Sequence, residues 1–547
     1  MLDWLKQYRR ADLAGDVGAG IIVAMMMIPQ GMAYALVAGL PPVTGLYASI
    51  LPPLLYALFG TSSSQSVGPM AIISLMTASA LAPLAAPGSS LYGVLACQLA
   101  LLAGAVLLAC GLLRVGFLAN FFSRPVMNGF TLGSSVVIAL GQFDTLLGGP
   151  VTAPHWPSAL LGIGAVAFLL LARRYGARLL RRVGVPGGAA EVGARLAPML
   201  LVIAAILLVM GLHLDAEGVR VIGAVPGGLP HADLAVSNAH WQALARPALL
   251  IGFMNFLIAM SGAQALALKR GEKLDTNREL VGLGLANAGS ALTGGYPVTG
   301  SLSRSAVNFA AGARTQLAGV ISAALLAGAL VLPTGWLAPL PLPVLAATII
   351  VAVLGMLELD TLKTSWRFDR ADAAALLATG GGVLLLGVEA GVVLGLLLSL
   401  GTMIWRESRP HIAVLGRIAG TEHFRNIDRY TAETDPRVLL LRVDAGLFFG
   451  NVEAVNARIE AALAAHPAAR HLVLVLSAVN AIDTSALFGL LELNGTLVKQ
   501  GVTLHLAEVK GPVMDRLRAS TLLSALSGRI FLSTANAWDA LARDNNT

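Results

Sequence analysis

The stretch GGYPVTGSLSRSAVNFAAGARTQLAGV, residues 294–320, is rich in glycine, serine and threonine and has an arginine, Arg304, near its middle. An apolar run follows it at 316–333, and runs of membrane-spanning length recur from residue 17 to residue 405. The chain is 56% hydrophobic and 12% charged, whereas soluble domains are about 25% charged. These features favour a membrane protein over a large soluble α/β enzyme, so the polar stretch lies beside a membrane span.

The rest of the composition gives little indication of catalytic chemistry. The first apolar segment contains Pro29, Gln30 and Gly31 without a small-residue cleavage site, which indicates a retained helix rather than a signal peptide. Cys97 and Cys110 share one apolar segment and predict packed thiols. The net charge of +7 over 547 residues gives no indication of nucleic-acid binding. The sequence has no nucleotide loop of the GxxxxGKS/T type and no HExxH, so we expect neither an enzyme nor a metal or cofactor site.

Apolar runs predict fourteen membrane segments. They lie near 15–34, 43–60, 69–84, 92–112, 122–141, 158–175, 196–212, 244–266, 277–293, 300–311, 316–333, 341–357, 372–387 and 389–405. With the N-terminus inside, the basic loops 173–195 and 269–278 fall inside, and the acidic loop 213–243 falls outside. This distribution obeys the positive-inside rule. The even number of segments then places the N-terminus and the C-terminal region in the cytoplasm.

Two of these segments share an unusual pattern. The third is SVGPMAIISLMTASALAPLAA, from residue 66, and the tenth is YPVTGSLSRSAVNFAAG, residues 296–312. Both are short and begin with a polar run containing Pro and Gly, and they correspond if the chain is two sets of seven segments. Such paired, interrupted segments indicate a transporter binding site, because irregular backbone persists in a membrane only where it lines a cavity.

Helices that start within the membrane predict an anion site. Their first N–H groups lack partners and their N-terminal dipole ends are partly positive, so two such starts facing each other suit an anion. Arg304 adds a full charge, and a charge within a membrane indicates function. Nearby hydroxyls can cap a helix or donate to the anion, namely those of Ser66, Thr299, Ser301 and Ser303. The structural alternatives are packing or kinks for the glycines and prolines, and snorkelling or a carbonyl partner for Arg304.

Around residue 406 the sequence changes from membrane spans to a soluble pattern. Strands of a parallel or mixed sheet are predicted at 437–443, 471–477 and 502–508, with helical periodicity at 452–465 and 485–499. Alternating strands and helices indicate a small α/β domain. We therefore expect a transmembrane domain at 1–405, a linker with the start of the cytoplasmic region at 406–436, and the α/β domain at 437–547.

Essentially the whole chain resembles the SulP (sulfate permease) family of anion transporters and channels. The resemblance rests on IPQGMAYALVAGLPPVTGLYASILPPLLYALFGTSSSQSVGPMA at 28–71 and on TNRELVGLGLANAGSALTGGYPVTGSLSRSAVNFAAGARTQLAGV at 276–320. NAIDTSALFGLLEL, at 480–493, resembles part of a STAS domain. The resemblance implies a seven-plus-seven inverted repeat, about 12–212 and 244–405, divided into core and gate domains. It also implies elevator-like alternating access and a homodimer with STAS contacts.

The same resemblance implies that the anion lies between the starts of the third and tenth segments. At the matching positions, Gln30 and Tyr34 would line the pocket with an amide donor and a ring edge. Arg304 would raise the local potential. Backbone N–H groups would come from Met70, Ala71, Ser301, Leu302 and Ser303. The alternatives are an interhelical hydrogen bond for Gln30 and plain packing for Tyr34.

Asn255 departs from a common pattern of the family. In LLIGFMNFLIAMSGAQ (249–264), it stands where many bacterial relatives carry a carboxylate linked to proton or sodium coupling. Ala259 stands where sodium-dependent bicarbonate members use a hydroxyl. A buried carboxylate can hold or release a proton, whereas an amide cannot. Sodium coupling and the usual proton route are therefore disfavoured, and exchange or uncoupled movement is favoured. Asn255 can still hydrogen-bond the anion or a neighbouring helix.

Ser485, in IDTS (482–485), matches the serine that kinases phosphorylate in soluble STAS proteins. The alternative is that Asp483, Thr484 and Ser485 cap the following helix. The latter interpretation is the one we favour for a transporter.

The sequence thus predicts a secondary transporter of the inner (plasma) membrane that moves a small anion. The family resemblance makes sulfate the first candidate. Bicarbonate, chloride and a dicarboxylate remain candidates, because the expected donors suit tetrahedral, planar and monatomic anions alike. The alternatives are an anion channel or uncoupled conductor, and an anion sensor that signals through the STAS domain.

Overall fold

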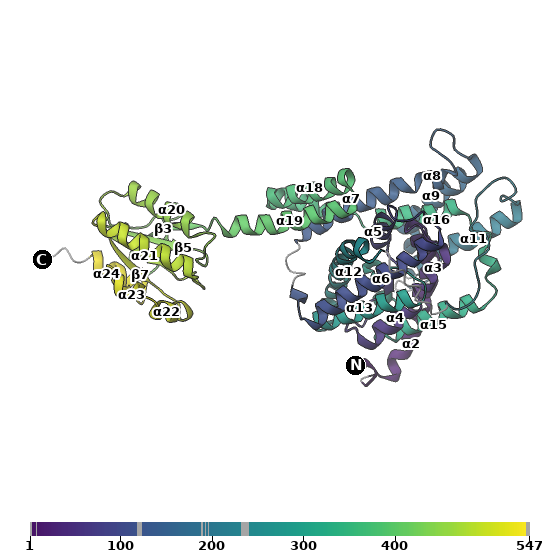
Figure 1. The fold of residues 1–547 in the computed structure, drawn as a ribbon, viewed down its shortest axis with the longest axis horizontal. Helices are drawn as coiled ribbons and strands as arrows, with labels where there is room; N and C mark the ends of the chain where they lie inside the picture. Colours follow the sequence, from purple (N-terminus) through teal and green to yellow (C-terminus); the bar gives the residue numbers. More distant parts are fainter. Residues whose placement is uncertain are drawn as a thin grey trace. The chain divides into compact units, whose positions relative to one another are not determined.

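The computed structural model describes residues 3–6, 8–117, 123–186, 190–191, 193–194, 196–230 and 240–542. The chain forms two compact units that divide between Ser399 and Leu400, within helix α19 (Val388–Glu407). Arg195 and residues 231–239, which belong to the predicted inside and outside loops, lie outside the described residues. The predicted class, a helical membrane protein with a C-terminal α/β region, is confirmed (Figure 1).

The helical unit consists of two halves, each with a two-residue strand followed by a short helix in its interior. The first half contains α1 (Asp3–Lys6), η1 (Arg10–Asp12), α2 (Leu13–Val37), α3 (Pro42–Tyr47), α4 (Leu51–Phe59), β1 (Val67–Gly68), α5 (Ala71–Leu81), α6 (Ser90–Leu112), α7 (Arg124–Gly141), α8 (Phe143–Leu147), α9 (Trp156–Arg182) and α11 (Ala197–Leu212). The second half contains α12 (Trp241–Arg270), α13 (Thr276–Leu292), β2 (Thr299–Gly300), α14 (Leu302–Ala310), α15 (Leu317–Val331), η3 (Thr334–Leu337), α16 (Leu342–Leu354), α17 (Leu359–Phe368), α18 (Arg370–Leu386) and α19.

Helix packing repeats between the halves. α15 packs against α2 as α6 packs against α12, and α15 packs against α4 as α6 packs against α13. In the same way, α7 packs against α18 as α16 packs against α9. Each pair joins one helix from each half, and exchanging the halves reproduces the pattern. This is the arrangement that an inverted repeat predicts.

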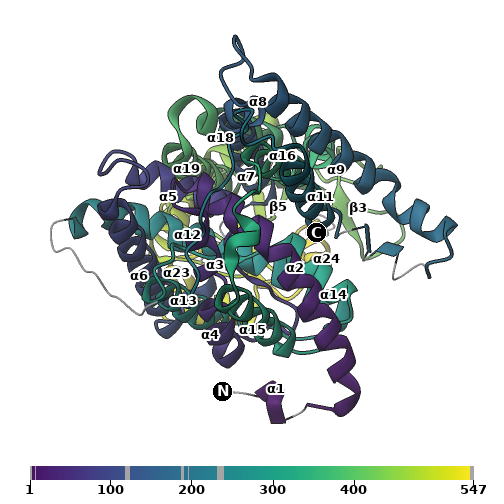
Figure 2. The same ribbon diagram turned by 90° about the vertical axis from the view of Figure 1, so that its right-hand side faces the viewer.

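The helices also divide into two packed groups. A first helix group contains α2–α6 and α12–α15, and a second helix group contains α7–α9, α11 and α16–α19. Within the second group, α7 and α18 lie side by side in both views (Figures 1 and 2). The two groups meet where α2 packs against α11 and α16, and where α5 packs against α7. Both short half-helices, α5 and α14, belong to the first group.

The spans vary in length. Among the described residues, seven helices are long and apolar enough to cross a membrane, and four further apolar helices are shorter. The count of fourteen membrane segments stays a prediction. The expected segment 43–60 is divided into α3 and α4, because Pro52 and Pro53 cannot continue a helix through Ala48 and Ser49.

Glycines allow the close helix crossings. A Cβ added to Gly31 of α2 would lie 3.0 Å from the carbonyl oxygen of Gly45 in α3, and one added to Gly380 of α18 would lie 3.0 Å from that of Gly129 in α7. Larger side chains at these positions would push the backbones apart.

The C-terminal unit is a six-stranded mixed sheet in the order β4-β3-β5-β6-β7-β8. Its elements are β3 (Ile412–Arg417), β4 (Phe424–Asn426), β5 (Val438–Val443), α20 (Val452–Ala465), β6 (His471–Val475), α21 (Thr484–Lys499), β7 (Thr503–Ala507), α22 (Gly511–Arg518), α23 (Leu522–Ala525), β8 (Ile530–Phe531) and α24 (Thr534–Ala542). α20–α23 pack on one face of the sheet and α24 on the other. β3 and β4, from the expected linker 406–436, form the antiparallel edge of this sheet.

Candidate functional site

The two half-helices start from a pair of hydrogen-bonded strands. β1 and β2 run antiparallel, with Val67 opposite Gly300 and Gly68 opposite Thr299. α5 begins three residues after Gly68, and α14 begins two residues after Gly300. Two segments more than 200 residues apart therefore place two helix N-termini next to one another, as the interrupted segments predict.

In the part of the chain that the structure describes, the N-cap side chain does not cap the start of α5. Its N-cap residue, Met70, is extended, with φ of −144°, and provides no side-chain cap. Met70 and the first helical residue, Ala71, are both buried. The first N–H groups of a helix have no intrahelical partner, so those of α5 can point to a bound anion.

The start of α14 is capped by its own sequence. The Ser301 Oγ accepts a hydrogen bond from the Arg304 backbone N–H at 3.5 Å. The Ser301 backbone N–H donates to the Ser66 carbonyl at 3.0 Å and is therefore occupied. Leu302 and Ser303 form the first turn, and both side chains are exposed, so they would act through their backbone N–H groups. The Ser303 hydroxyl lies 3.2 Å from that of Ser301.

Arg304 is buried between the two strands and the start of α5. Its side chain is 1% exposed, and its Nη1 donates to the Pro69 carbonyl at 2.8 Å. Among the described residues, its Nε and Nη2 have no hydrogen-bond partner and no acid forms an ion pair with it. A Cβ added to Gly68 would lie 3.5 Å from Nη2 and 2.7 Å from the Met27 Cε. Two N–H donor groups of the buried, positively charged guanidinium thus have no acceptor among the described residues.

Of the two α2 residues predicted to line the pocket, Tyr34 packs beside the start of α5. Tyr34 is 7% exposed and packs in one apolar cluster with Ala71 and Met27. Tyr34 and Tyr296 are both within electrostatic reach of the Arg304 guanidinium. The Gln30 Oε1 is buried and, in the part of the chain that the structure describes, has no hydrogen-bond partner. The structure thus gives no partner for the interhelical alternative at Gln30 through this oxygen.

Asn255 holds the chain that leads into β2. It is fully buried in α12, and its Nδ2 donates to the Val298 carbonyl. Its own backbone carbonyl accepts from the Thr299 Oγ1 at 3.0 Å. Asn287 of α13 donates to the same Val298 carbonyl at 2.9 Å and accepts from the Val298 N–H at 3.0 Å. The Asn255 side chain therefore holds the backbone that enters β2, and its contact with an anion stays a prediction.

A buried carboxylate supports the segment before β1. Glu279 of α13 is 1% exposed, and its oxygens accept from the Tyr56 hydroxyl at 2.7 Å and from both the N–H and hydroxyl of Thr61 at 2.5 Å. The Ser62 N–H completes the set at 2.9 Å. No pattern in the sequence indicates that these groups, which precede β1, are the donors to Glu279.

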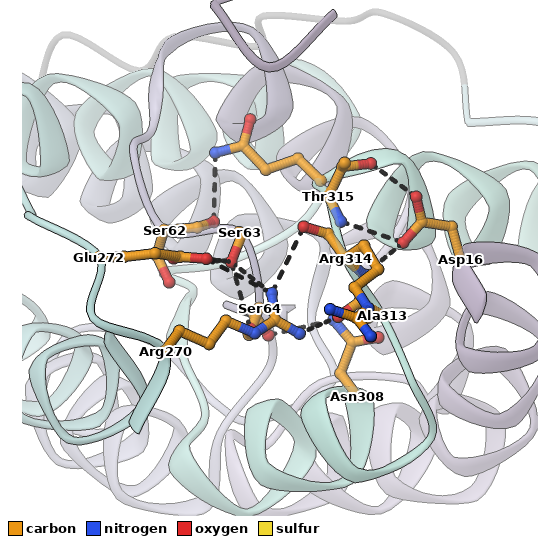
Figure 3. A network of polar contacts seen from close by, with 11 residues as sticks. Asp16, Ser62, Ser63, Ser64, Arg270, Glu272, Asn308, Ala313, Arg314 and Thr315 are labelled. Atoms are coloured by element: carbon orange, nitrogen blue, oxygen red, sulfur yellow. Dashed lines mark hydrogen bonds and ion pairs between the residues drawn. The ribbon is translucent and has the colours of Figure 1, made fainter. Parts of the chain in front are cut away.

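A second network joins the loop after α14 to the same segment (Figure 3). Arg270, at the end of α12, donates to the Ser63 hydroxyl at 2.7 Å and to the Ala313 carbonyl, and its Nη1 lies 3.6 Å from the Glu272 carboxylate. Asp16 of α2 is fully buried and accepts from the Arg314 N–H at 2.6 Å. These contacts fix both polar segments to the first helix group. No short-range pattern in the sequence points to them.

Ser485 lies in the C-terminal unit, at the exposed first turn of α21. Asp483 is the N-cap, and its Oδ1 accepts from the Ala486 N–H at 2.8 Å. The capping interpretation therefore applies to Asp483, and modification of Ser485 stays a prediction. Across the residues that the structure describes, no group of three or more His, Cys, Asp or Glu side chains could hold a metal ion.

Relatives of the chain are named as transporters. A probable sulfate transporter of Mycobacterium tuberculosis (strain CDC 1551 / Oshkosh) is 36% identical over 98% of this chain and 97% of its own length. Probable sulfate transporter 4.2 of Arabidopsis thaliana is 33% identical over 96% of this chain and 81% of its own length.

Solved structures share the fold at low sequence identity. The murine Solute Carrier 26 family member A9 anion transporter, in the inward-facing state, has a TM-score of 0.88 at 21% identity and covers 99% of this chain and 94% of its own. The transmembrane domain of a cyanobacterium bicarbonate transporter, BicA, has a TM-score of 0.60 at 22% identity over 71% of this chain and 98% of its own.

Family models match both units. The model of the sulfate permease family matches residues 13–379, and the model of the STAS domain matches residues 429–537. The sequence relatives cover nearly the whole chain and are transporters rather than enzymes. The chain therefore belongs to the sulfate permease family, with a STAS domain in its C-terminal unit.

Proposed function

We propose that the protein is a secondary transporter that holds a small anion between the N-termini of α5 and α14. Sulfate is the first candidate, because the sequence relatives are named as sulfate transporters. Bicarbonate, chloride and small dicarboxylates are the next candidates for the same donors. The protein is a multi-pass protein of the inner (plasma) membrane, with its N-terminus and STAS domain in the cytoplasm, and it forms a homodimer with STAS contacts.

One observation carries the proposal. The Arg304 guanidinium is buried beside two helix starts, and among the described residues its Nε and Nη2 lack partners. A buried charge is costly unless an opposite charge or hydrogen-bond acceptors compensate it. An anion would provide both, and it would also meet the first N–H groups of α5.

Elevator-like movement is supported by the way the site is attached. The β1–β2 pair, Glu279 and the network around Arg270 tie both half-helices to the first helix group. The second helix group contributes none of these contacts. The anion would therefore move with the first group past the second.

The test is uptake of radiolabelled sulfate and bicarbonate into proteoliposomes, with imposed proton, sodium or counter-anion gradients. We expect saturable sulfate uptake that depends on a counter-anion, and a loss of roughly tenfold or more in Arg304→Met, because a charged hydrogen-bonding group is removed. Arg304→Lys keeps the charge and should retain part of the activity. Large unsaturated currents would favour a channel, and binding without flux would favour a sensor. Normal uptake by Arg304→Met would refute the proposed site.

A further inference from the structure

Two buried hydroxyls lie side by side along a helix of the second helix group. Ser134 and Ser135 lie in the middle of α7, with exposed fractions of 0% and 2%. Neither Oγ has a hydrogen-bond partner within the ranges that the structure describes. Buried polar side chains in native proteins almost always have a partner, so each exception needs an explanation.

Several other helical hydroxyls of this unit donate to a carbonyl of their own helix. Thr131, one turn earlier in α7, donates to the Met127 carbonyl at 2.9 Å. Thr77 of α5 donates to the Ile73 carbonyl at 2.8 Å, and Thr379 of α18 donates to the Ala375 carbonyl at 2.7 Å. A bond to the carbonyl four residues earlier is the usual solution for such a residue. Ser134 and Ser135 do not adopt it.

The neighbours of these serines on α7 show which way they face. Residues three and four apart share a helix face. Ile138 lies four residues after Ser134 and three after Ser135, and it packs in the cluster that contains Tyr34 and Ala71. Ala139, four residues after Ser135, packs against the same cluster. This cluster joins α7 to the start of α5 and to α2, the two elements beside Arg304.

The depth of the serines matches the depth of the site. Ser135 lies eleven residues after Arg124, the first residue of α7, which is about 16 Å along a helix. That distance is close to half of the roughly 30 Å hydrocarbon thickness. Half-helices that start within the membrane place their N-termini at a similar depth.

We propose that Ser134 and Ser135 of α7 donate hydrogen bonds to the anion as the first helix group carries it past α7, and that they help to select the anion. The inference rests on the proposed function and adds a contact from the second helix group. A tetrahedral oxyanion presents several oxygen acceptors, whereas chloride presents a single centre. Sulfate should therefore depend more strongly on the two hydroxyls than chloride does.

The first test measures sulfate uptake and its inhibition by chloride for wild type and the double variant Ser134→Ala/Ser135→Ala in proteoliposomes. We expect the KM for sulfate to rise roughly tenfold, with a smaller change in the inhibition constant of chloride. Thr379→Val is the matched control, since its hydroxyl is buried in the same helix group but bonded to its own helix. Equal changes for both anions, or none, would overturn the inference.

The second test measures whether a reagent, and by inference the anion, can reach position 135. In a background in which Cys97 and Cys110, the two cysteines of the chain, are replaced by alanine, Ser135→Cys is treated with a small charged methanethiosulfonate reagent. The inference requires that the reagent reacts and that saturating sulfate slows the reaction. Failure to react, or reaction at the same rate with sulfate present, would contradict it. Loss of uptake in Arg304→Met with unchanged serine variants would leave the proposed function standing and reject this inference alone.

Discussion

Arg304 is a buried cation whose Nη1 donates to the Pro69 carbonyl. Its charge in an apolar chain could be recognised without coordinates, because an arginine beside a membrane span is costly. Its partner could not be recognised, since Pro69 lies more than 200 positions away and accepts through a backbone carbonyl. Every residue has a backbone carbonyl, so the sequence does not indicate which carbonyl accepts the hydrogen bond. Gln30 and Tyr34 were assigned by resemblance, and their roles stay predictions.

Asn255 offers a test of coupling. Its Nδ2 donates to the buried Val298 carbonyl, and an ionised carboxylate cannot donate. In Asn255→Asp the new side chain must bind a proton to keep that bond, so we expect sulfate uptake to acquire a dependence on the proton gradient. Uptake at inside-alkaline and inside-acid gradients measures this. Asn255→Leu, which has no titratable group, should show no such dependence, and equal behaviour of the two variants would reject the argument.

His505 predicts how the STAS domain responds to acid. Its Nδ1 accepts from the Arg529 N–H at 3.0 Å, and its Nε2 lies 3.2 Å from the His471 Nδ1. Burial, with the nearby His471 and Arg529, lowers its pKa from 6.5 to about 4. Because the unfolded chain binds the proton more readily, this contribution to stability is complete above about pH 6.5 and is lost as the pH falls towards 4.

The measurement is hydrogen exchange of the C-terminal unit in the full-length protein between pH 7 and pH 4.5, corrected for the intrinsic rate. His505→Gln cannot bind the proton, and we expect it to lose less protection on acidification than wild type does. His466→Gln, on the half-buried end of α20, is the control and should follow wild type. Identical acid sensitivity in all three proteins would exclude His505 as the cause.

Pro and Gly residues in the sequence predict the two half-helices, but no sequence pattern predicts the strands β1 and β2 that join them. β1 and β2 contain two residues each, and so short a strand has no alternating pattern. Pairing between them depends on the tertiary fold. For the same reason Asp16 and Glu279 resemble ordinary charged residues at segment ends, although both are buried. Amphipathic periodicity predicts elements well, whereas contacts between distant loops require the structure.

Glu279 predicts the stability of the segment before β1. Replacing it with Gln puts an NH₂ group against donors, since its two oxygens accept four hydrogen bonds from Tyr56, Thr61 and Ser62. We expect Glu279→Gln to lower the free energy of unfolding by about 1–3 kcal/mol. Thermal unfolding in detergent measures this. Glu272→Gln, whose side chain is 35% exposed, should have a smaller effect, and a reversed order would contradict the assignment.

For the proposed transport movement of the whole molecule, the division into two helix groups is more informative than the number of membrane spans. The membrane segments and the α/β unit were predicted from long apolar runs and alternating strands, whereas the inverted repeat and its division into core and gate domains came only from the family resemblance. Which helices pack together in each group is a property of side-chain packing, which a single sequence does not display.

Movement between the groups can be tested by cross-linking. Leu75 of α5 and Ile138 of α7 pack in one cluster across the boundary between the groups. In the background without Cys97 and Cys110, joining cysteines at these positions with a short bifunctional thiol reagent should abolish uptake, and reduction should restore it. Cysteines at Leu107 of α6 and Leu283 of α13, which pack together within the first group, are the control and should tolerate the link. Full uptake by the cross-linked α5–α7 pair would argue against elevator movement.

The antiparallel pairing of β1 with β2 has a consequence for the direction of transport. Because the strands run in opposite directions, α5 and α14 lead away from the pair in opposite directions. In the proposed transporter, one half-helix would then lie towards each side of the membrane, and the fold itself would set no preferred direction of flow. We expect the protein to work as importer or exporter according to the gradients around it, so that the cell sets the direction of flow through its metabolism rather than through the protein.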